Sequence, residues 1–252
     1  EATCAAVSAD GNAIVAGAGG IAVLDASDPA GQPIDTIAVP GAEALVLAGE
    51  IACLLADDAL RCLRVRVLGR PAVVGRAAVP VSAGRIASTG GRVFVSARSS
   101  GMHVFDVIVD GERRELRPVL VVEARFAEGA PFGGTFAFVA DGAAGLRVFA
   151  LEDAATGAGT VREVARFQPA AAVHGVSVSG SVAVVAAGAA GVMVLDVAAP
   201  AVPRQLAAIA SPDARDVALE GAFLLVADAS AGLRSFDLTV PSRPVENAPA
   251  LP

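Results

Sequence analysis

The stretch GLRVF, Gly145 to Phe149, follows a run of small residues, FVADGAA, at Phe138 to Ala144. Related stretches occur at five other places: GIAVLD opens at Gly20, ALRCLR at Ala59, GMHVFD at Gly101, GVMVLD at Gly191 and GLRSFD at Gly232. The six opening residues are spaced 39, 42, 44, 46 and 41 residues apart. A period of about 40 to 45 residues is typical of repeat arrays in which each repeat forms one blade of a β-propeller. The sequence therefore predicts six copies of one structural unit.

Each unit can be divided into four short strands, as the last unit illustrates. Its apolar runs are Asp216–Glu220, Phe223–Ala227, Leu233–Leu238 and a weaker Val245–Leu251, separated by Gly, Asp and Pro. Short runs rich in Val, Leu and Phe between turn residues predict β-strands. No segment combines helical spacing with caps at both ends. We therefore expect an all-β protein, a six-bladed β-propeller of four-stranded antiparallel blades.

The repeats fill the chain and predict a single β-propeller domain over residues 1–252. The expected blades are approximately 1–40, 41–80, 81–126, 127–169, 170–212 and 213–252. The stretch from Phe167 to Leu195 carries no charged residue over 29 positions, which is long enough for a helix to span a bilayer. Its glycines and serines fall at the turn and alternation positions of the fifth unit, so we interpret this stretch as strands.

One column of apolar residues explains why the units must stack. The same position of the third strand holds Leu24, Leu63, Phe105, Val148 or Phe149, Leu195 and Phe236. A single four-stranded sheet cannot bury both of its faces, so each unit needs neighbours. We interpret this column as core and not as part of a cofactor site.

The composition narrows the classes of partner. Hydrophobic residues make up 54% of the chain and charged residues 18%, which does not fit a disordered protein. The formal net charge is −7, and all nineteen positive residues are arginines scattered along the chain. Binding to phosphate backbones needs a concentrated basic surface. The sequence therefore argues against a nucleic-acid partner.

Four stretches resemble the LVIVD-type repeat, a β-propeller repeat of bacterial and archaeal proteins, many of them exported. They are Gly19–Pro33, Val139–Leu151, Gly188–Pro203 and Ala229–Pro244. The second unit departs from the pattern at Ala59 and Arg64, and the fourth at Ala150. The resemblance implies a β-propeller, and it carries no catalytic motif with it.

A recurring carboxylate ends the third strand in four units, at Asp25, Asp106, Asp196 and Asp237. Equivalent positions of different blades lie far apart, so these four residues could not share a metal ion. Asp side chains accept hydrogen bonds from nearby backbone N–H groups in turns. We therefore expect a turn-forming role for them.

A polar ring is predicted where the first strands begin. His174 begins the first strand of the fifth unit, and Glu43, Arg85 and Arg215 fall at or within one residue of the same place in other units. If the first strand is innermost, these residues surround the mouth of the central channel. They form either a site for a small ligand or peptide, or a merely solvated rim. The other histidine, His103, lies in mid-strand, and we expect it to be a partly buried structural residue.

Cys53 and Cys62 form a testable pair. A two-residue turn at Asp57-Asp58 would place these cysteines directly opposite each other in adjacent strands. They then form either a disulfide, as an oxidising compartment allows, or two small buried thiols. Cys4 is left without a predicted partner.

The leading hypothesis is a non-catalytic β-propeller that acts as a binding or scaffolding module for another protein. Its interaction face would consist of the loops between second and third strands and the starts of the first strands. We expect no cofactor, no metal and no membrane span. We place the protein outside the cell, in the periplasm or at the cell surface, with any export signal outside these residues.

Two alternatives stay open. One is a hydrolase or lactonase-like enzyme with a small-molecule site at the channel mouth. A lactonase would need a converging set of Glu, Asn, Asp and His ligands for a hard cation, and the chain has only two asparagines, Asn12 and Asn247. The other alternative is a structural subunit of a larger surface assembly.

Overall fold

The structure is a computed structural model. It describes residues 2–7, 12–17, 19–25, 33, 35–39, 41–48, 51–56, 59–64, 72–80, 85–89, 91–97, 99–110, 113–124, 128–132, 135–152 and 160–247. The chain divides into two compact units, residues 1–122 and 123–252.

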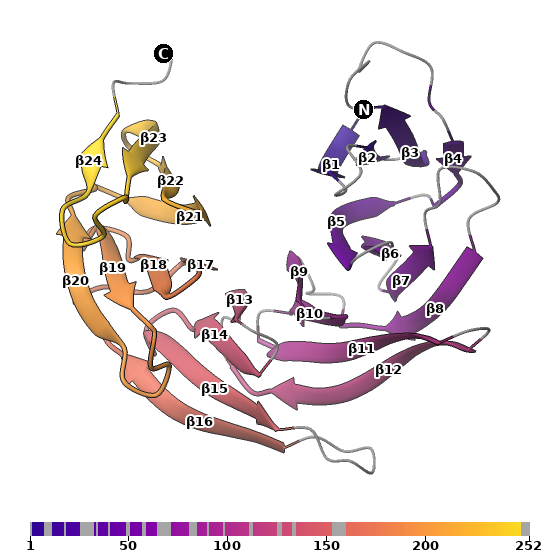
Figure 1. The fold of residues 1–252 in the computed structure, drawn as a ribbon, viewed down its shortest axis with the longest axis horizontal. Helices are drawn as coiled ribbons and strands as arrows, with labels where there is room; N and C mark the ends of the chain where they lie inside the picture. Colours follow the sequence, from indigo (N-terminus) through magenta and orange to yellow (C-terminus); the bar gives the residue numbers. More distant parts are fainter. Residues whose placement is uncertain are drawn as a thin grey trace. The chain divides into compact units, whose positions relative to one another are not determined.

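The first unit contains three four-stranded antiparallel sheets (Figure 1). The first sheet consists of β1 (Ala2–Val7), β2 (Asn12–Gly17), β3 (Gly20–Asp25) and β4 (Asp35–Ile37). The second consists of β5 (Ala42–Ala48), β6 (Ile51–Ala56), β7 (Ala59–Arg64) and β8 (Ala72–Ala78). The third consists of β9 (Arg85–Thr89), β10 (Arg92–Ser96), β11 (Met102–Asp110) and β12 (Arg113–Val122).

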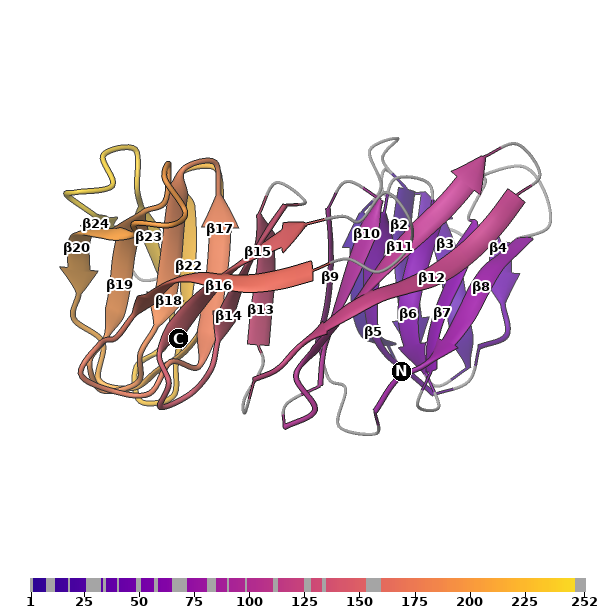
Figure 2. The same ribbon diagram turned by 90° about the horizontal axis from the view of Figure 1, so that it is seen from below.

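The second unit repeats the arrangement, and Figure 2 shows its strands running side by side within each sheet. The fourth sheet consists of β13 (Glu128–Phe132), β14 (Phe136–Ala140), β15 (Leu146–Glu152) and β16 (Thr160–Phe167). The fifth consists of β17 (Gly175–Ser179), β18 (Val182–Ala186), β19 (Val192–Asp196) and β20 (Arg204–Ile209). The sixth consists of β21 (Ala214–Glu220), β22 (Phe223–Asp228), β23 (Gly232–Asp237) and β24 (Val245–Glu246).

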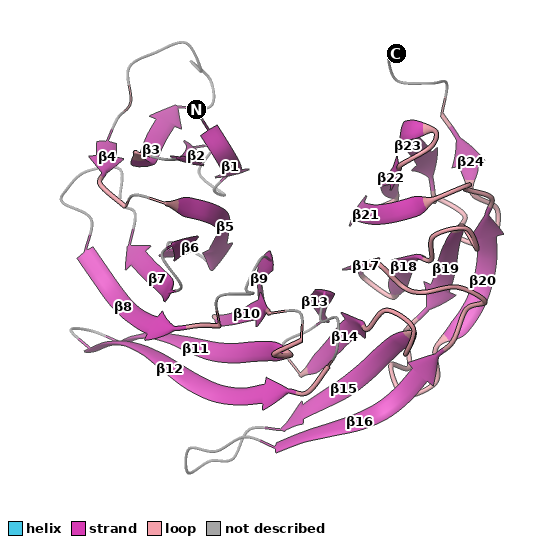
Figure 3. Cartoon of the chain, turned by 180° about the vertical axis from the view of Figure 1, so that it is seen from behind, coloured by secondary structure: helices cyan, strands magenta, loops and turns pink. Residues whose placement is uncertain are grey.

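The all-β prediction is confirmed, and each sheet lies inside one of the six expected repeats. No helix is present among the residues drawn in colour in Figure 3, and so none that is long and apolar enough to cross a membrane. The uncharged stretch between Phe167 and Leu195 forms strands, as predicted. The last predicted strand, Val245–Leu251, is shorter in the structure: its described part is β24, and residues 248–252 lie outside the described residues.

The core lies between successive sheets of each unit. In the second unit, one face of the fifth sheet packs through Val184, Val192 and Val194 on the first three strands of the sixth. Its opposite face packs on the fourth sheet through Val185, Met193 and Leu195. The predicted third-strand column is buried at Leu63, Phe105, Val148, Phe149, Leu195 and Phe236, whereas Leu24 is half-buried. In these clusters, a column side chain packs between its own sheet and a neighbouring one. Removal of one large side chain of the column should therefore destabilise both of these sheets.

The carboxylates predicted to end the third strands have two different roles, and Asp106 lies within β11, which continues to Asp110. Asp196 accepts a hydrogen bond from the backbone N–H of Ala198, and Asp237 accepts bonds from the N–H and the hydroxyl of Thr239. These two residues form turns, as predicted. Asp106 instead binds Arg92 and Arg117, each across 2.8 Å. The side chain of Asp25 lies outside the described residues.

The two cysteines of the second sheet face each other across β6 and β7. Cys53 pairs with Cys62 in the register that the sequence predicts, their Cα atoms are 4.1 Å apart, and a disulfide joins them. The turn residues Asp57 and Asp58 lie outside the described residues. Behind the disulfide, Cys62 pairs with Gly75 of β8, and a Cβ on that glycine would lie only 2.6 Å from Cβ of Leu116. The third sheet therefore packs directly over the backbone beside the disulfide.

Candidate functional site at the first-strand starts

Three of the four predicted rim residues share one register position at the start of a first strand. The register of β5 shifts between Ala42 and Ala44, so Glu43 is the extra residue of a β-bulge. The register of β21 shifts in the same way at Arg215. His174 directly precedes β17 and donates its backbone N–H to Ala186, the residue that pairs with Gly175. β-Bulges reorient a side chain relative to the rest of the strand.

Arg85 does not share this position. It pairs with Ser96 as the first residue of β9, in register with Asp216 and one residue beyond the bulge site. Because successive side chains of a strand point to opposite faces, a shift of one residue changes the face on which a side chain lies. Within the first unit, Glu43 and Arg85 are both exposed.

In the second unit, backbone hydrogen bonds join the residue before each rim residue to a turn of the preceding sheet. The N–H and C=O groups of Gly142 bond to Val173, and those of Gly188 bond to Ala214, across 2.9 to 3.1 Å. His174 and Arg215 directly follow these two bridged residues. The loops between second and third strands and the starts of the next first strands therefore form one continuous surface.

The side chains at this surface lie close together around Gly188. This glycine has a φ of +50°, and a Cβ on it would lie 3.3 Å from Nε2 of His174 and 4.0 Å from Oδ1 of Asp213. Nη2 of Arg215 lies 2.7 Å from Oδ2 of Asp213, with 55% of the arginine side chain exposed. The site thus presents a partly exposed imidazole and an oriented guanidinium.

A buried carboxylate, Asp228, holds this arrangement in place. Its Oδ2 accepts hydrogen bonds from the Ser211 hydroxyl and the Asp213 N–H, and its Oδ1 accepts bonds from the N–H groups of Ser230 and Ala231. Burial alone raises the pKa of the Asp228 carboxyl, but these four hydrogen bonds outweigh it and lower the pKa to about 2. Asp228 therefore fixes both the turn after β22 and the segment that positions Arg215.

The comparisons with known proteins agree with the repeat pattern. Residues 171–206 and 212–248 match the family model of the LVIVD repeat. The second unit of the chain thus contains two LVIVD repeats. The first matched stretch covers β17 to β19 and the start of β20, and the second covers all four strands of the sixth sheet. Together they include His174, Asp213, Arg215 and Asp228. No curated protein matches the chain in sequence.

Solved structures show the same fold at low sequence identity. A protein from Lactobacillus plantarum is 16% identical with a TM-score of 0.71, and the match covers 98% of this chain and 84% of that one. A candidate 6-phosphogluconolactonase from Bacteroides fragilis is 13% identical with a TM-score of 0.70, over 97% of this chain and 82% of that one. Chaetomium thermophilum Sqt1, bound to the N-terminus of the ribosomal protein L10, is 14% identical with a TM-score of 0.67, over 93% and 71%. Together with the six sheets, this likeness confirms the predicted six-bladed β-propeller fold.

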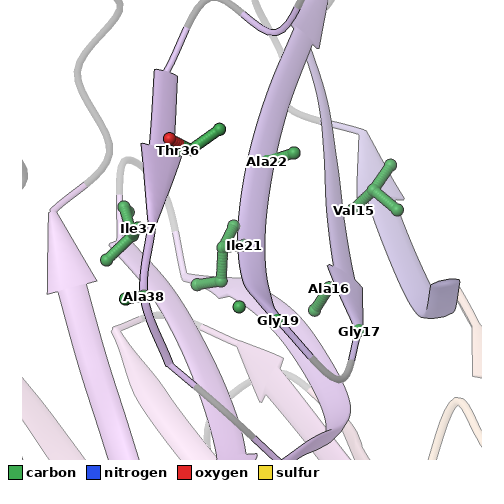
Figure 4. A pocket seen from close by; sticks show the side chains of 10 residues that line it. Val15, Ala16, Gly17, Gly19, Ile21, Ala22, Thr36, Ile37 and Ala38 are labelled. Atoms are coloured by element: carbon green, nitrogen blue, oxygen red, sulfur yellow. The ribbon is translucent and has the colours of Figure 1, made fainter. Parts of the chain in front are cut away.

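A separate hollow lies on the first sheet (Figure 4). It is lined by Val15, Ala16, Gly17, Gly19, Gly20, Ile21, Ala22, Thr36, Ile37 and Ala38. Thr36 supplies the only side-chain oxygen, and none of the lining residues titrates. In the described ranges, no group of three or more His, Cys, Asp or Glu residues is placed to hold a metal ion.

Asp228 and its partners were not predicted as site residues. The short loop after β22 was expected, but its carboxylate was not assigned a role. The sequence contains a signal for it, since an Asp followed two residues later by Ser and four later by Gly is a pattern of side-chain-capped turns. The bond to Ser211 joins residues 17 positions apart and depends on the fold.

Proposed function

We propose that this β-propeller protein is a non-catalytic binding module that docks another protein on the loop end of its second unit. The docking surface consists of the turns 141–145, 187–191 and 228–232 together with His174 and Arg215. The observation that carries the proposal is the pair of backbone bridges, Gly142 to Val173 and Gly188 to Ala214, because they hold turns and strand starts as one rigid surface.

The chemistry of this surface suits a protein partner. Ala143, Ala189, Ala229 and Ser230 are exposed, and their small side chains leave a flat surface with an accessible backbone. Arg215 is exposed and already oriented by Asp213, so less side-chain entropy is lost when it binds. Arginine is enriched in protein interfaces.

The geometry supports binding over catalysis. The carboxylates beside the rim already serve the protein itself: Asp213 binds Arg215, Asp228 holds its turn, and Asp216 accepts the N–H of Val217. The structural neighbours include Sqt1 with its bound L10 peptide as well as the candidate lactonase from Bacteroides fragilis. A shared fold does not distinguish between these functions, so the function is argued from the residues of the site.

We further propose that the protein works outside the cytoplasm. The Cys53–Cys62 disulfide supports this location, because structural disulfides persist in oxidising compartments. The test is the mass of the peptide that contains both cysteines, from protein purified under thiol-blocking conditions from its source. We expect a mass lower by two hydrogen atoms. Two blocked thiols would contradict this location.

Site-specific photo-crosslinking tests the docking surface. A photoreactive residue is placed at Ala229, at the proposed surface, or at Ala222, in the turn at the other end of β22; both positions are exposed. In the source organism we expect a defined adduct from position 229, which is lost when Arg215→Glu is added, and no adduct from position 222. Equal labelling at both positions would contradict the proposed surface.

The crosslinking experiment and an activity assay distinguish the two alternatives. A structural subunit would crosslink at both ends to the same neighbour in fixed stoichiometry. An enzyme would hydrolyse a sugar lactone, and the His174→Ala variant would lose that activity. Either result would replace the binding module as the function of this chain.

A further inference from the structure

The fifth sheet ends in a strand that lacks the protection found on the other fourth strands. Among the described strands, β20 pairs with β19 alone, and it lies at the outer edge of its sheet (Figures 1 and 3). Exposed edge strands are normally kept from pairing with other chains by charge, proline or brevity. Between Gln205 and Ala208, β20 has no charged residue and no proline.

The other described fourth strands each have such protection. β4 and β24 are three and two residues long. β8 contains Arg76, β12 contains Arg117 and Pro118, and β16 contains Arg162 and Arg166. Among the fourth strands as the structure describes them, only β20 is both long enough to pair and free of charge along its middle.

Register makes the difference specific to one residue. Arg166 of β16 pairs with the second residue of β15, Arg147. In the fifth sheet the corresponding partners are Ala208 and Met193. Arg166 and Ala208 thus occupy the same place, and both are exposed. The charged guanidinium that protects the edge of β16 is replaced by a methyl group in β20.

We propose that the edge of β20 pairs antiparallel with β20 of a second copy of this chain. In a register symmetric about Leu206, the two Leu206 residues lie opposite each other and Arg204 lies opposite Ala208 of the other copy, so no like charges face each other. Arg204 lies at the start of the strand, opposite Asp196 in the register of its own sheet, and outside the uncharged run from Gln205 to Ala208. Val202, 64% exposed just before the strand, adds apolar surface. Such a contact is isologous, the commonest symmetry of homodimers.

Sedimentation velocity tests this inference, which stands apart from the proposed binding function. The full chain, of 24.9 kDa, is measured from about 1 µM to about 1 mM, a range that covers weak association. We expect a reversible shift towards twice the monomer mass. The Ala208→Arg variant, which restores the residue of β16, should weaken dimerisation at least about tenfold.

Ala222→Arg is the matched control, since it adds the same charge at an exposed turn outside β20 and outside the proposed docking surface. It should dimerise like the wild type. Equal thermal unfolding midpoints of the two variants would show that both are folded. Arginine should be tolerated at position 208, because Arg166 occupies the same register position in β16. A wild type that stays monomeric throughout, or a dimer that Ala208→Arg leaves intact, would overturn the proposal.

Discussion

The fourth and sixth sheets contain the same arginine in the same place, in different surroundings. Arg147 and Arg234 both follow the G-L of the third strand, both lie over a phenylalanine two residues later, and both donate to a backbone carbonyl outside their own sheet. Each also binds a glutamate of the fourth strand, Glu163 or Glu246.

The surroundings of the two arginines differ because of the carboxylate that precedes each of them in the sequence. In the fourth sheet, Asp141 is buried and lies 2.9 Å from Arg147, whose side chain is only 16% exposed. In the sixth sheet, the equivalent Asp228 holds its own turn, and the carboxylate that pairs with Arg234 is the half-exposed Glu246. We therefore expect the same repeat residue to stabilise the fold more where its carboxylate partner is more deeply buried. Repeat spacing alone does not reveal how deeply that partner is buried.

The largest expected effect is that of Arg147→Ala. It removes the arginine from the buried Asp141 and from Glu163, and a buried carboxylate that loses its cationic partner costs about 3–5 kcal/mol. Urea unfolding monitored by circular dichroism measures the loss. A decrease in the free energy of unfolding below about 1 kcal/mol would show that Arg147 and Arg234 contribute equally, whatever the burial of their partners.

Asp228→Ala should lower the free energy of unfolding by about 1.5–3 kcal/mol at neutral pH, because hydrogen bonds to a charged acceptor are lost. The pKa of Asp228 is about 2 in the folded protein against an ordinary 3.8. Its stabilisation is therefore present above about pH 4 and is lost as the pH falls through about 2. The difference between wild type and variant should shrink over this range. A difference that stays constant with pH would contradict the assigned charge state.

Arg234→Ala should cost about 1 kcal/mol or less, since its partner Glu246 is half exposed and solvent screens such pairs. Arg234→Lys keeps the charge but loses the two-point contact with Glu246, so it should lie between the wild type and the alanine variant. The measurement is the midpoint of urea unfolding, side by side with Arg147→Ala. A loss as large as that of Arg147→Ala would show that burial of the partner is not what matters.

The smallest effect concerns His103, which occupies the same repeat position in the third sheet. Burial lowers the pKa of this imidazole, although a hydrogen bond with the Ser100 backbone acts in the opposite direction, and its Nε2 is buried without a hydrogen-bond partner. The neutral form is therefore favoured in the folded protein. Stability should be complete above pH 6.5 and decline by less than about 1 kcal/mol below it. His103→Met, which copies Met193, should remove this dependence; an unchanged profile would assign it to another group.

The sequence predicted the parts of this protein that depend on spacing along the chain. The repeat length and the alternation of apolar runs with turn residues were enough to predict the strands and the third-strand column. They also predicted the register that places Cys53 opposite Cys62. These features arise within one hairpin or from one repeated pattern. The fold and the position of His174 and Arg215 at the strand starts could therefore be anticipated.

The pairings that shape the candidate site could not be predicted in the same way. Asp106 was expected to form a turn but binds Arg92 and Arg117 instead, because the folded sheet brings these arginines beside it. The bulge at Arg215 and the bond from Ser211 to Asp228 depend on how a turn meets the next sheet. The bond from Ser211 to Asp228 joins residues of different repeats, and the pairs of Asp106 join different strands of one sheet. A repeat pattern carries no information about which polar residues will meet.

Native mass spectrometry of the protein purified from its source tests the central claim most directly. A binding module predicts an ion heavier than the 24.9 kDa chain by the mass of a different polypeptide. The Arg215→Glu variant, expressed in the same organism, should lose that partner while remaining folded. The mass of the chain alone, or a gain limited to a small molecule bound near His174, would contradict the claim that this β-propeller serves to bind another protein.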